Sequence, residues 1–458
     1  MNKKLIISLA VVLCVAVVGV FGYGAVKDML IKKDPVNYLL YSTTKSNHSA
    51  VDASFSGKFD LDKEAMTSNM MMLSADPEAM ATFVTSLVNN LTVDGKVVYK
   101  LDGKNAAFHF YESMNLNYAG KPLIDLALGM DQEQLVIKSN TLYDKGFVMT
   151  KTELFDLMKE QEGLDLNKIE IQKYIDVLSL ENDPNYKALA KDVKGYETIV
   201  RAFLAGLEKG DAVTVTLDDG TNVKCDSLKM TVTYDQMIDL YIDLMNEARN
   251  DDKLKVLVKS KIVELLNLAL SSGDYELMGF EKAEVESAIT EFDTNFETEW
   301  NAGIDEAIAM YQDVKDQMSS TLVTDINYDV TIAIDKKYQI RQMTYTLDTM
   351  GVKMAQTITF NAFDGDVAIE ALSTPENSIS IFALSEDEDL AAETGYDIMD
   401  QGLTNIIEGE ALTTLMTDLK TYSEVLPADE KEGIVGLAEY FFENKDMLKS
   451  LIMMNLGY

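Results

Sequence analysis

The chain has 458 residues and a formal net charge of −36, from 76 acidic and 40 basic side chains. The acidic residues are spread along the whole sequence, and no dense cluster of Lys and Arg occurs beyond the N-terminal segment. This argues against nucleic acid as a partner, because binding a phosphate backbone requires a basic stripe. Hydrophobic residues make up 47% of the chain, which argues for a packed core and against wholesale disorder.

The N-terminal segment predicts a membrane partner. Residues 5–26 form a mostly apolar run of 22 residues that follows Lys3 and Lys4. At about 1.5 Å per residue the run reaches roughly 33 Å, enough to cross a bilayer once. We therefore expect a retained single-pass anchor in the cell membrane. The two lysines would lie inside the cell, and the rest of the chain, the body of the protein, would lie outside the cytoplasm. A cleaved signal peptide, cut after Gly22, stays open as the alternative, and either one exports the body.

The two cysteines indicate neither a lipid attachment site nor a disulfide. Cys14 lies within the apolar run behind Val12 and Leu13, whereas a lipid-attachment signal requires a small residue directly before the cysteine. Beyond the run only Cys225 remains, so the exported part has no intramolecular disulfide and must be stabilised by packing.

The first part of the body reads as a short helix and then a meander. After an apolar patch at 38–41, the sequence alternates with a period of two from Val51, as a half-buried antiparallel strand requires. The methionine-rich stretch 65–88 has a helical pattern. Further strands, separated by turn residues, are expected at 91–101, 106–118, 123–129, 134–139 and 141–149.

The middle of the chain returns to a helical period. Helices are expected over 151–209, with a break at 182–184, and they are followed by a hairpin of strands at 212–217 and 222–233. Amphipathic helices are then expected at 234–248 and 252–270.

One long helix is expected at 281–320. Its apolar stripe runs from Val285 to Met318 in nine steps, which is about 3.67 residues per step and follows one side of a nearly straight helix. The helix would be roughly 60 Å long. Trp300, the only tryptophan, lies in this stripe, which favours a core role.

A second meander and a helical region complete the chain. Strands are expected at 326–334, 339–348, 352–360 and 367–372, and the helical region ends with an apolar helix at 427–456. These changes of period suggest an N-terminal anchor or signal segment at 1–33, two α+β modules at 34–210 and 211–372, and a helical region at 373–458.

The sequence offers no enzyme signature. There are two histidines, no H-E-x-x-H pattern, no nucleophile elbow and no phosphate-binding loop. The acidic segments 60–64 and 386–389 lack the glycine and the spaced final glutamate of an EF-hand, and solvated surface is the better interpretation. We expect a non-enzymatic protein without a cofactor or a metal.

Methionine is the unusual component. The chain has 25 methionines, and flexible thioether side chains suit an adaptable apolar surface as well as an ordinary core. If they line a ligand site, the helical segments supply its candidate residues, which are Met70, Met71, Phe83, Phe441, Phe442 and Met453.

The element order predicts the fold class α+β, with curved antiparallel meanders and helices packed across one face. This coarse pattern is similar to the lipoprotein-localisation type of half-barrel, which carries lipids in the cell envelope. The Lys-Lys start, the apolar run and the tether Asp34–Tyr38 also resemble uncharacterised anchored surface proteins of Gram-positive bacteria. The resemblance covers pattern alone and carries over no functional residue. It implies an envelope protein that binds an apolar or lipid-like ligand between sheet and helices. A structural or protein-interaction scaffold at the cell surface is the alternative.

Overall fold

The computed structural model describes residues 31–449 apart from 72–73, 103–106, 163–167, 181–182, 321–325, 350–351, 369–377, 445–446 and 448. The predicted anchor at 5–26 and Met453 lie outside the described residues. No helix within them is long and apolar enough to cross a bilayer.

The chain forms two compact units, each assembled from separate segments. In the described residues unit 1 comprises 31–47, 152–213 and 224–340, and unit 2 comprises 48–151, 214–223 and 341–449. The division into modules at 34–210, 211–372 and 373–458 remains a prediction from the changes of period.

Unit 1 is mainly helical. It begins with α3 (Pro35–Lys45), which Asp34 caps by accepting hydrogen bonds from two backbone N–H groups, and which buries Tyr38, Leu39 and Leu40. The other helices are α6 (Lys151–Glu162), α7 (Ile171–Leu178), α8 (Pro184–Leu189), α9 (Lys194–Phe203), α10 (Tyr234–Asn250), α11 (Asp252–Ser272), α12 (Asp274–Leu277) and α13 (Lys282–Ser320).

Local sequence signals set the boundaries of these helices. Asp183 and Asp251 cap α8 and α11 with their carboxylates, and Thr233 and Gln236 form a reciprocal capping box at the start of α10. Gly273, with φ of 80°, ends α11 in the left-handed conformation that glycine adopts without strain. The predicted break at 182–184 is confirmed for the residues that the structure describes, since Asp183 precedes α8 as its cap and Pro184 lies in the first turn.

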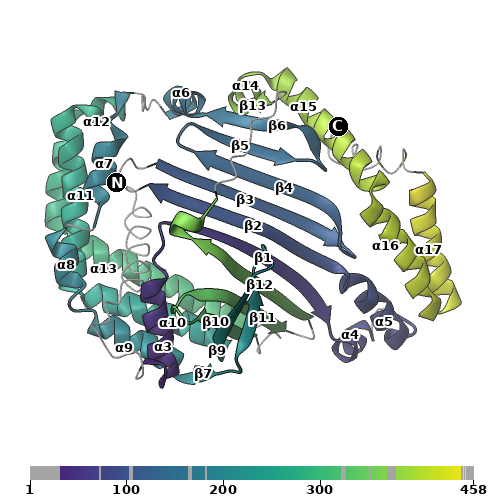
Figure 1. The fold of residues 1–458 in the computed structure, drawn as a ribbon. Helices are drawn as coiled ribbons and strands as arrows, with labels where there is room; N and C mark the ends of the chain where they lie inside the picture. The colour runs from purple at the N-terminus through teal and green to yellow at the C-terminus, as the bar shows by residue number, and fades with distance from the viewer. Residues whose placement is uncertain are drawn as a thin grey trace. The chain divides into compact units, whose positions relative to one another are not determined.

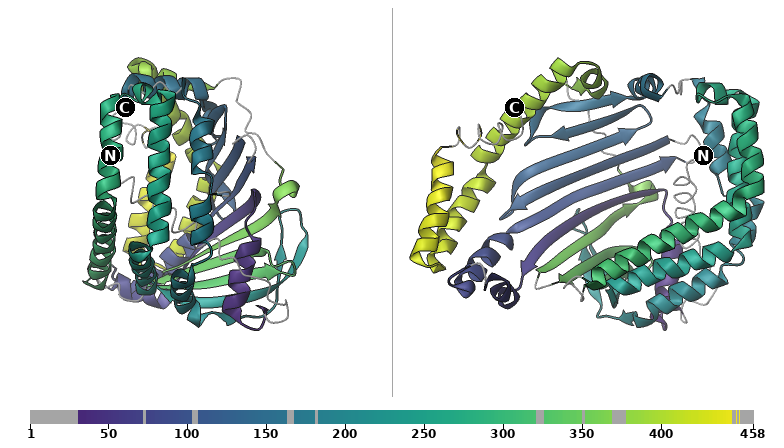
Figure 2. Two further views of the ribbon diagram at one scale, coloured as in Figure 1. Left: turned by 90° about the vertical axis from the view of Figure 1, so that its left-hand side faces the viewer. Right: turned by 180° about the vertical axis from the view of Figure 1, so that it is seen from behind.

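The long helix α13 supplies much of the core of unit 1. It packs against α10 and α11 (Figure 2). The buried residues of α13 follow the predicted stripe and include Val285, Phe292, Phe296, Trp300, Ile304 and Ala307. The strands of unit 1 are β7 (Glu208–Lys209), β9 (Asn222–Thr233) and β10 (Asn327–Asp335), in the order β10-β9-β7, and the predicted hairpin of β8 (Val213–Thr216) with β9 is present.

Unit 2 is built on a large open sheet with the strand order β13-β6-β5-β4-β3-β2-β1-β12-β11 (Figure 1). Except for the short β13, which pairs with β6 in parallel, neighbouring strands are antiparallel. The strands are β1 (Ala50–Leu61), β2 (Leu91–Asp102), β3 (Ala107–Tyr118), β4 (Lys121–Asp131), β5 (Gln134–Ser139), β6 (Tyr143–Thr150), β11 (Ile340–Thr349), β12 (Val352–Phe363) and β13 (Ile379–Ser380).

Two expectations for unit 2 need correction. The helical stretch at 65–88 forms two helices, α4 (Lys63–Met70) and α5 (Pro77–Val88), because Pro77 cannot continue a helix while Asp76 caps a new one. Of the strand expected at 367–372, residues 367 and 368 have no regular structure, and 369–372 lie outside the described residues.

The C-terminal helices of unit 2 follow the sheet in the chain, and hydrogen bonds join some of them to strand ends and turns. These helices are α14 (Ile381–Glu386), α15 (Glu388–Glu408), α16 (Glu410–Tyr422) and α17 (Ala428–Glu443). Asp418 of α16 accepts a hydrogen bond from Tyr118 at the end of β3, and Asn405 of α15 donates to the carbonyl of Thr141 between β5 and β6. The predicted α+β class, the long helix and the helical C-terminal region are confirmed.

Candidate functional site: the two faces of the unit 2 sheet

The sheet of unit 2 has one apolar and one polar face, because side chains alternate along each strand. The cross-strand register assigns the faces. We use the name apolar face for the following set: Met343, Tyr345 and Leu347 of β11; Met354, Gln356 and Ile358 of β12; Ala53, Phe55, Gly57 and Phe59 of β1; Val93, Gly95, Val97, Tyr99 and Leu101 of β2; Phe108, Phe110, Glu112, Met114 and Leu116 of β3; and Ile124, Leu126, Leu128 and Met130 of β4.

The apolar side chains of this face stand in rows that cross the strands. One row contains residues that are directly paired from β11 to β4, namely Met343, Ile358, Phe55, Gly95, Met114 and Leu126. At roughly 4.8 Å between neighbouring strands, this row spans about 24 Å. Parallel rows contain Tyr99, Phe110 and Met130, and Leu347, Met354 and Phe59.

Several large side chains of the apolar face are accessible to solvent. Leu101, Met114, Leu126, Met130 and Met354 are between 39% and 55% exposed. Most of the remaining side chains of the face are half-buried. A contiguous apolar surface of this kind on a folded chain marks an interaction site or a ligand surface.

Gly95 shapes the centre of the face. The ring of Phe55 lies across it, and a Cβ at position 95 would be 2.4 Å from Cζ of Phe55 and 2.0 Å from the carbonyl oxygen of Ser113. Only a residue without a side chain fits there, which allows the aromatic ring to lie flat against the neighbouring strand.

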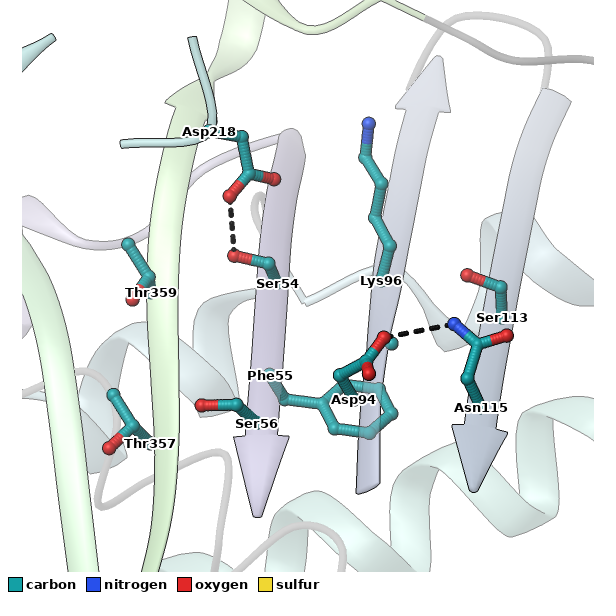
Figure 3. A pocket seen from close by; sticks show the side chains of 11 residues that line it. Ser54, Phe55, Ser56, Asp94, Lys96, Ser113, Asn115, Asp218, Thr357 and Thr359 are labelled. Carbon is teal, nitrogen blue, oxygen red and sulfur yellow. Dashed lines mark hydrogen bonds between the residues drawn. The ribbon is translucent and has the colours of Figure 1, made fainter. Parts of the chain in front are cut away.

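The opposite face carries a polar groove of about 400 Å³, shown in Figure 3. Alternate residues of four strands line it, together with Asp218 from the turn that follows β8. The polar lining residues are Ser54, Ser56, Asp94, Lys96, Ser113, Asn115, Asp218, Thr357 and Thr359, and the groove reaches Phe55 and Gly95.

The carboxylates of the polar groove are paired within it. Asp218 accepts hydrogen bonds from Ser54 at 2.9 Å and from Asn361 at 2.9 Å. Asp94 accepts one from Asn115 at 2.9 Å and a further one from Asn117. These bonds hold the turn at 218 on the sheet and join β2 to β3, so a structural role accounts for both acids.

The groove shows no reactive arrangement. Lys96 forms an ion pair with Asp52 at 3.2 Å, and Thr357 and Thr359 are hydrogen-bonded to Thr344 and Gln342 of the next strand. No hydroxyl of the groove contacts a histidine in the described residues. In the same part of the chain no cluster of three or more His, Cys, Asp or Glu side chains could hold a metal ion.

A part-buried hydrogen bond lies at the end of the sheet where β3 turns into β4. Burial raises the pKa of Tyr118 to about 12, and the hydrogen bond that Tyr118 donates to Asp418 at 3.0 Å adds to the effect. The phenol therefore stays neutral and acts as a donor that fixes α16 to β3.

The predicted lining residues that the structure describes, Met70, Met71 and Phe83, belong to α4, α5 and the segment between them, and not to the strands that form the apolar rows. Met70 is half-buried at the end of α4, Met71 is 67% exposed just beyond it, and Phe83 of α5 is 6% exposed. Phe441 and Phe442 belong to α17, their side chains are not among those described, and Met453 lies outside the described residues. Whether these residues line a site remains a prediction.

The residues of the apolar face are not among the candidate residues that the sequence predicts, although the strands that carry them show the expected alternation. The alternation from Val51 predicts a half-buried strand, and it shows that one face is apolar without showing what covers that face. The half-exposed side chains of β3 and β4 give that information, and they became apparent only from the structure.

A comparison with protein-family models found no match, and none was found among curated proteins or solved structures. The resemblance to lipid-carrying half-barrels and to anchored surface proteins therefore remains a prediction from the sequence pattern.

Proposed function

We propose that the protein is a non-enzymatic envelope protein that holds a lipid-like molecule by its acyl chain on the apolar face of unit 2. The row from Met343 to Leu126, with Met114 and Leu126 at 46% and 40% exposed, is the observation that supports this most directly. Covering such side chains with a hydrocarbon chain stabilises the complex by roughly 25 cal/mol for each Å² of apolar surface removed from water.

The composition of the face favours a flexible apolar ligand. Met114, Met130, Met343 and Met354 lie on it. Their unbranched thioether side chains adapt to ligand shapes that vary from one molecule to the next. The predicted anchor at 5–26 would keep the face near a membrane, which is the source of acyl chains. Extracytoplasmic localisation belongs to the same proposal.

Photolabelling tests the proposal on the full chain. The purified protein is incubated with octadecanol that carries a diazirine in its chain, irradiated and digested, and the labelled peptides are mapped by mass spectrometry. We expect saturable labelling of peptides from 107–131, because β3 and β4 contain the most exposed side chains of the face.

Two neighbouring substitutions on β3 form the matched pair. Met114→Glu places a charge on the apolar face, and Ser113→Glu places the same charge on the polar face beside Lys96. Labelling is expected to fall about tenfold or more in Met114→Glu and to persist in Ser113→Glu, because a carboxylate held against hydrocarbon is strongly disfavoured. Equal labelling in both variants, or none in the unmodified protein, would overturn the proposal.

A further inference from the structure

One carboxylate interrupts the apolar face. Glu112 of β3 is directly paired with Val97 of β2 and with Leu128 of β4, and Phe110 and Met114 flank it along its own strand. Its diagonal neighbours are Gly95, Tyr99, Leu126 and Met130. Side chains in direct and diagonal positions lie about 4.5–8 Å apart, so the carboxylate stands among apolar groups on all sides.

In the part of the chain that the structure describes, no partner accounts for the place of Glu112. The side chain is exposed, and within the described residues it forms neither a hydrogen bond nor an ion pair. It is the one carboxylate in the set that defines the apolar face, whereas the acids of the polar groove are held by amide and hydroxyl donors.

We infer that Glu112 selects the head group of the ligand, and that the molecule bound on the apolar face is an amphiphile with a cationic amine. The inference rests on the proposed function. An ammonium group beside Glu112 would gain a charge-assisted contact whose strength increases as the acyl chain excludes water around it. An anionic head would be repelled both by Glu112 and by the net charge of −36.

Three probes with the same diazirine-bearing octadecyl chain test the inference on the full chain: the amine, the alcohol and the carboxylate. Half-saturating concentrations for labelling of 107–131 are compared at pH 7 and low ionic strength. We expect the amine to saturate at roughly two- to tenfold lower concentration than the alcohol, and the carboxylate at higher concentration than both.

Substitutions at position 112 separate charge from packing. Glu112→Gln keeps the size of the side chain and should bring the amine and alcohol to within about twofold of each other, while Glu112→Lys should reverse the order of amine and carboxylate. Glu133→Gln, which removes an exposed glutamate in the turn between β4 and β5, is the control and should leave the order unchanged.

The outcomes distinguish this inference from the proposed function. Failure of the uncharged alcohol to label the face overturns the proposed function. Labelling by the alcohol without a preference for the amine, or with a preference that survives in Glu112→Gln, overturns the assignment of Glu112 alone. The Glu112→Gln variant could aggregate and still bind the three probes in the same order of affinity. That result would show that the carboxylate only prevents apolar faces of two molecules from stacking.

Discussion

At the scale of single residues, unit 1 contains a buried ion pair. Lys261 of α11 and Asp183 at the start of α8 form an ion pair at 2.6 Å, with side chains 7% and 6% exposed. Burial alone would raise the pKa of Asp183, but the hydrogen bonds from Lys261 and from the backbone N–H groups of Tyr186 and Asn185 outweigh it and lower the pKa. The carboxylate therefore caps a helix and neutralises a buried ammonium at once.

Asp183→Asn should lower the stability of the protein by at most about 3–5 kcal/mol at pH 7, because it removes the buried partner of Lys261 and leaves the half-exposed Glu264, at 3.5 Å, as its ion-pair partner. A carboxyl group with a lowered pKa stabilises the fold above its unfolded-state pKa and loses this contribution as pH falls through the folded value. The difference between the two proteins should hence shrink below about pH 4. Urea unfolding at several pH values measures it.

The exposed pair of Asp192 and Lys253 provides the control. Asp192→Asn should change stability little at any pH, since both side chains are in solvent. A deficit in Asp183→Asn that stays constant from pH 7 to pH 3 would contradict the assignment.

Gly95 gives a second test at this scale. Gly95→Ala should destabilise the protein by about 1–3 kcal/mol, since the added methyl group meets the Ser113 carbonyl and the Phe55 ring, and the backbone atom cannot move aside. Gly57→Ala on the neighbouring strand adds a methyl group with its nearest contact at 3.8 Å and should be tolerated. Thermal unfolding of both variants compares them, and equal melting temperatures would show that the sheet relaxes around position 95.

At the scale of elements, many helices and strands could be predicted because the hydrophobic residues of the sequence recur with a clear helical or strand period. The expected strand at 134–139 coincides with β5, and the long helix begins within one residue of the expected position. The two helices at 63–88 were not separated, because the pattern hides the break before Pro77. Which strands become neighbours depends on contacts between distant segments, as in the pairing of β1 with β12, and alternation does not encode it.

Helix α13 makes a prediction of its own. Trp300 is 2% exposed and packs near Phe296, with ring centroids 5.7 Å apart. Trp300→Ala should cost about 3–5 kcal/mol, because it removes a large side chain from a packed core. Met310 on the same helix is 56% exposed, and Met310→Ala should have a small effect. Denaturant midpoints of the two variants test this, and similar midpoints would mean that the stripe is not the core of unit 1.

At the scale of the whole molecule, we propose that the predicted anchor at 5–26 holds the protein at a membrane. Ile31 is buried and α3 begins at Pro35, so unit 1 starts only a few residues beyond the apolar run. We expect the mature protein to retain residues 5–26 and to resist extraction from membranes by alkaline carbonate. Intact mass measurement decides this, and a mature chain that starts at Tyr23 would show that the segment is a cleaved signal.

The apolar face depends on features at each scale. Alternation along each strand puts its side chains on one side, strand pairing brings them together, and a membrane would supply the ligand. Its candidate residues could not be selected from sequence, because an apolar strand face is usually covered and only the structure shows that Met114 and Leu126 are half-exposed.

Native mass spectrometry of the full chain tests the central claim most directly. The protein is purified gently from a bacterial host beside the Met114→Glu and Ser113→Glu variants, and each sample is also measured after solvent extraction. We predict an added mass that is recovered as lipid from the unmodified protein and from Ser113→Glu, and that is lost in Met114→Glu. An unmodified protein with no added mass, which also fails to take up added lipids, would contradict the account.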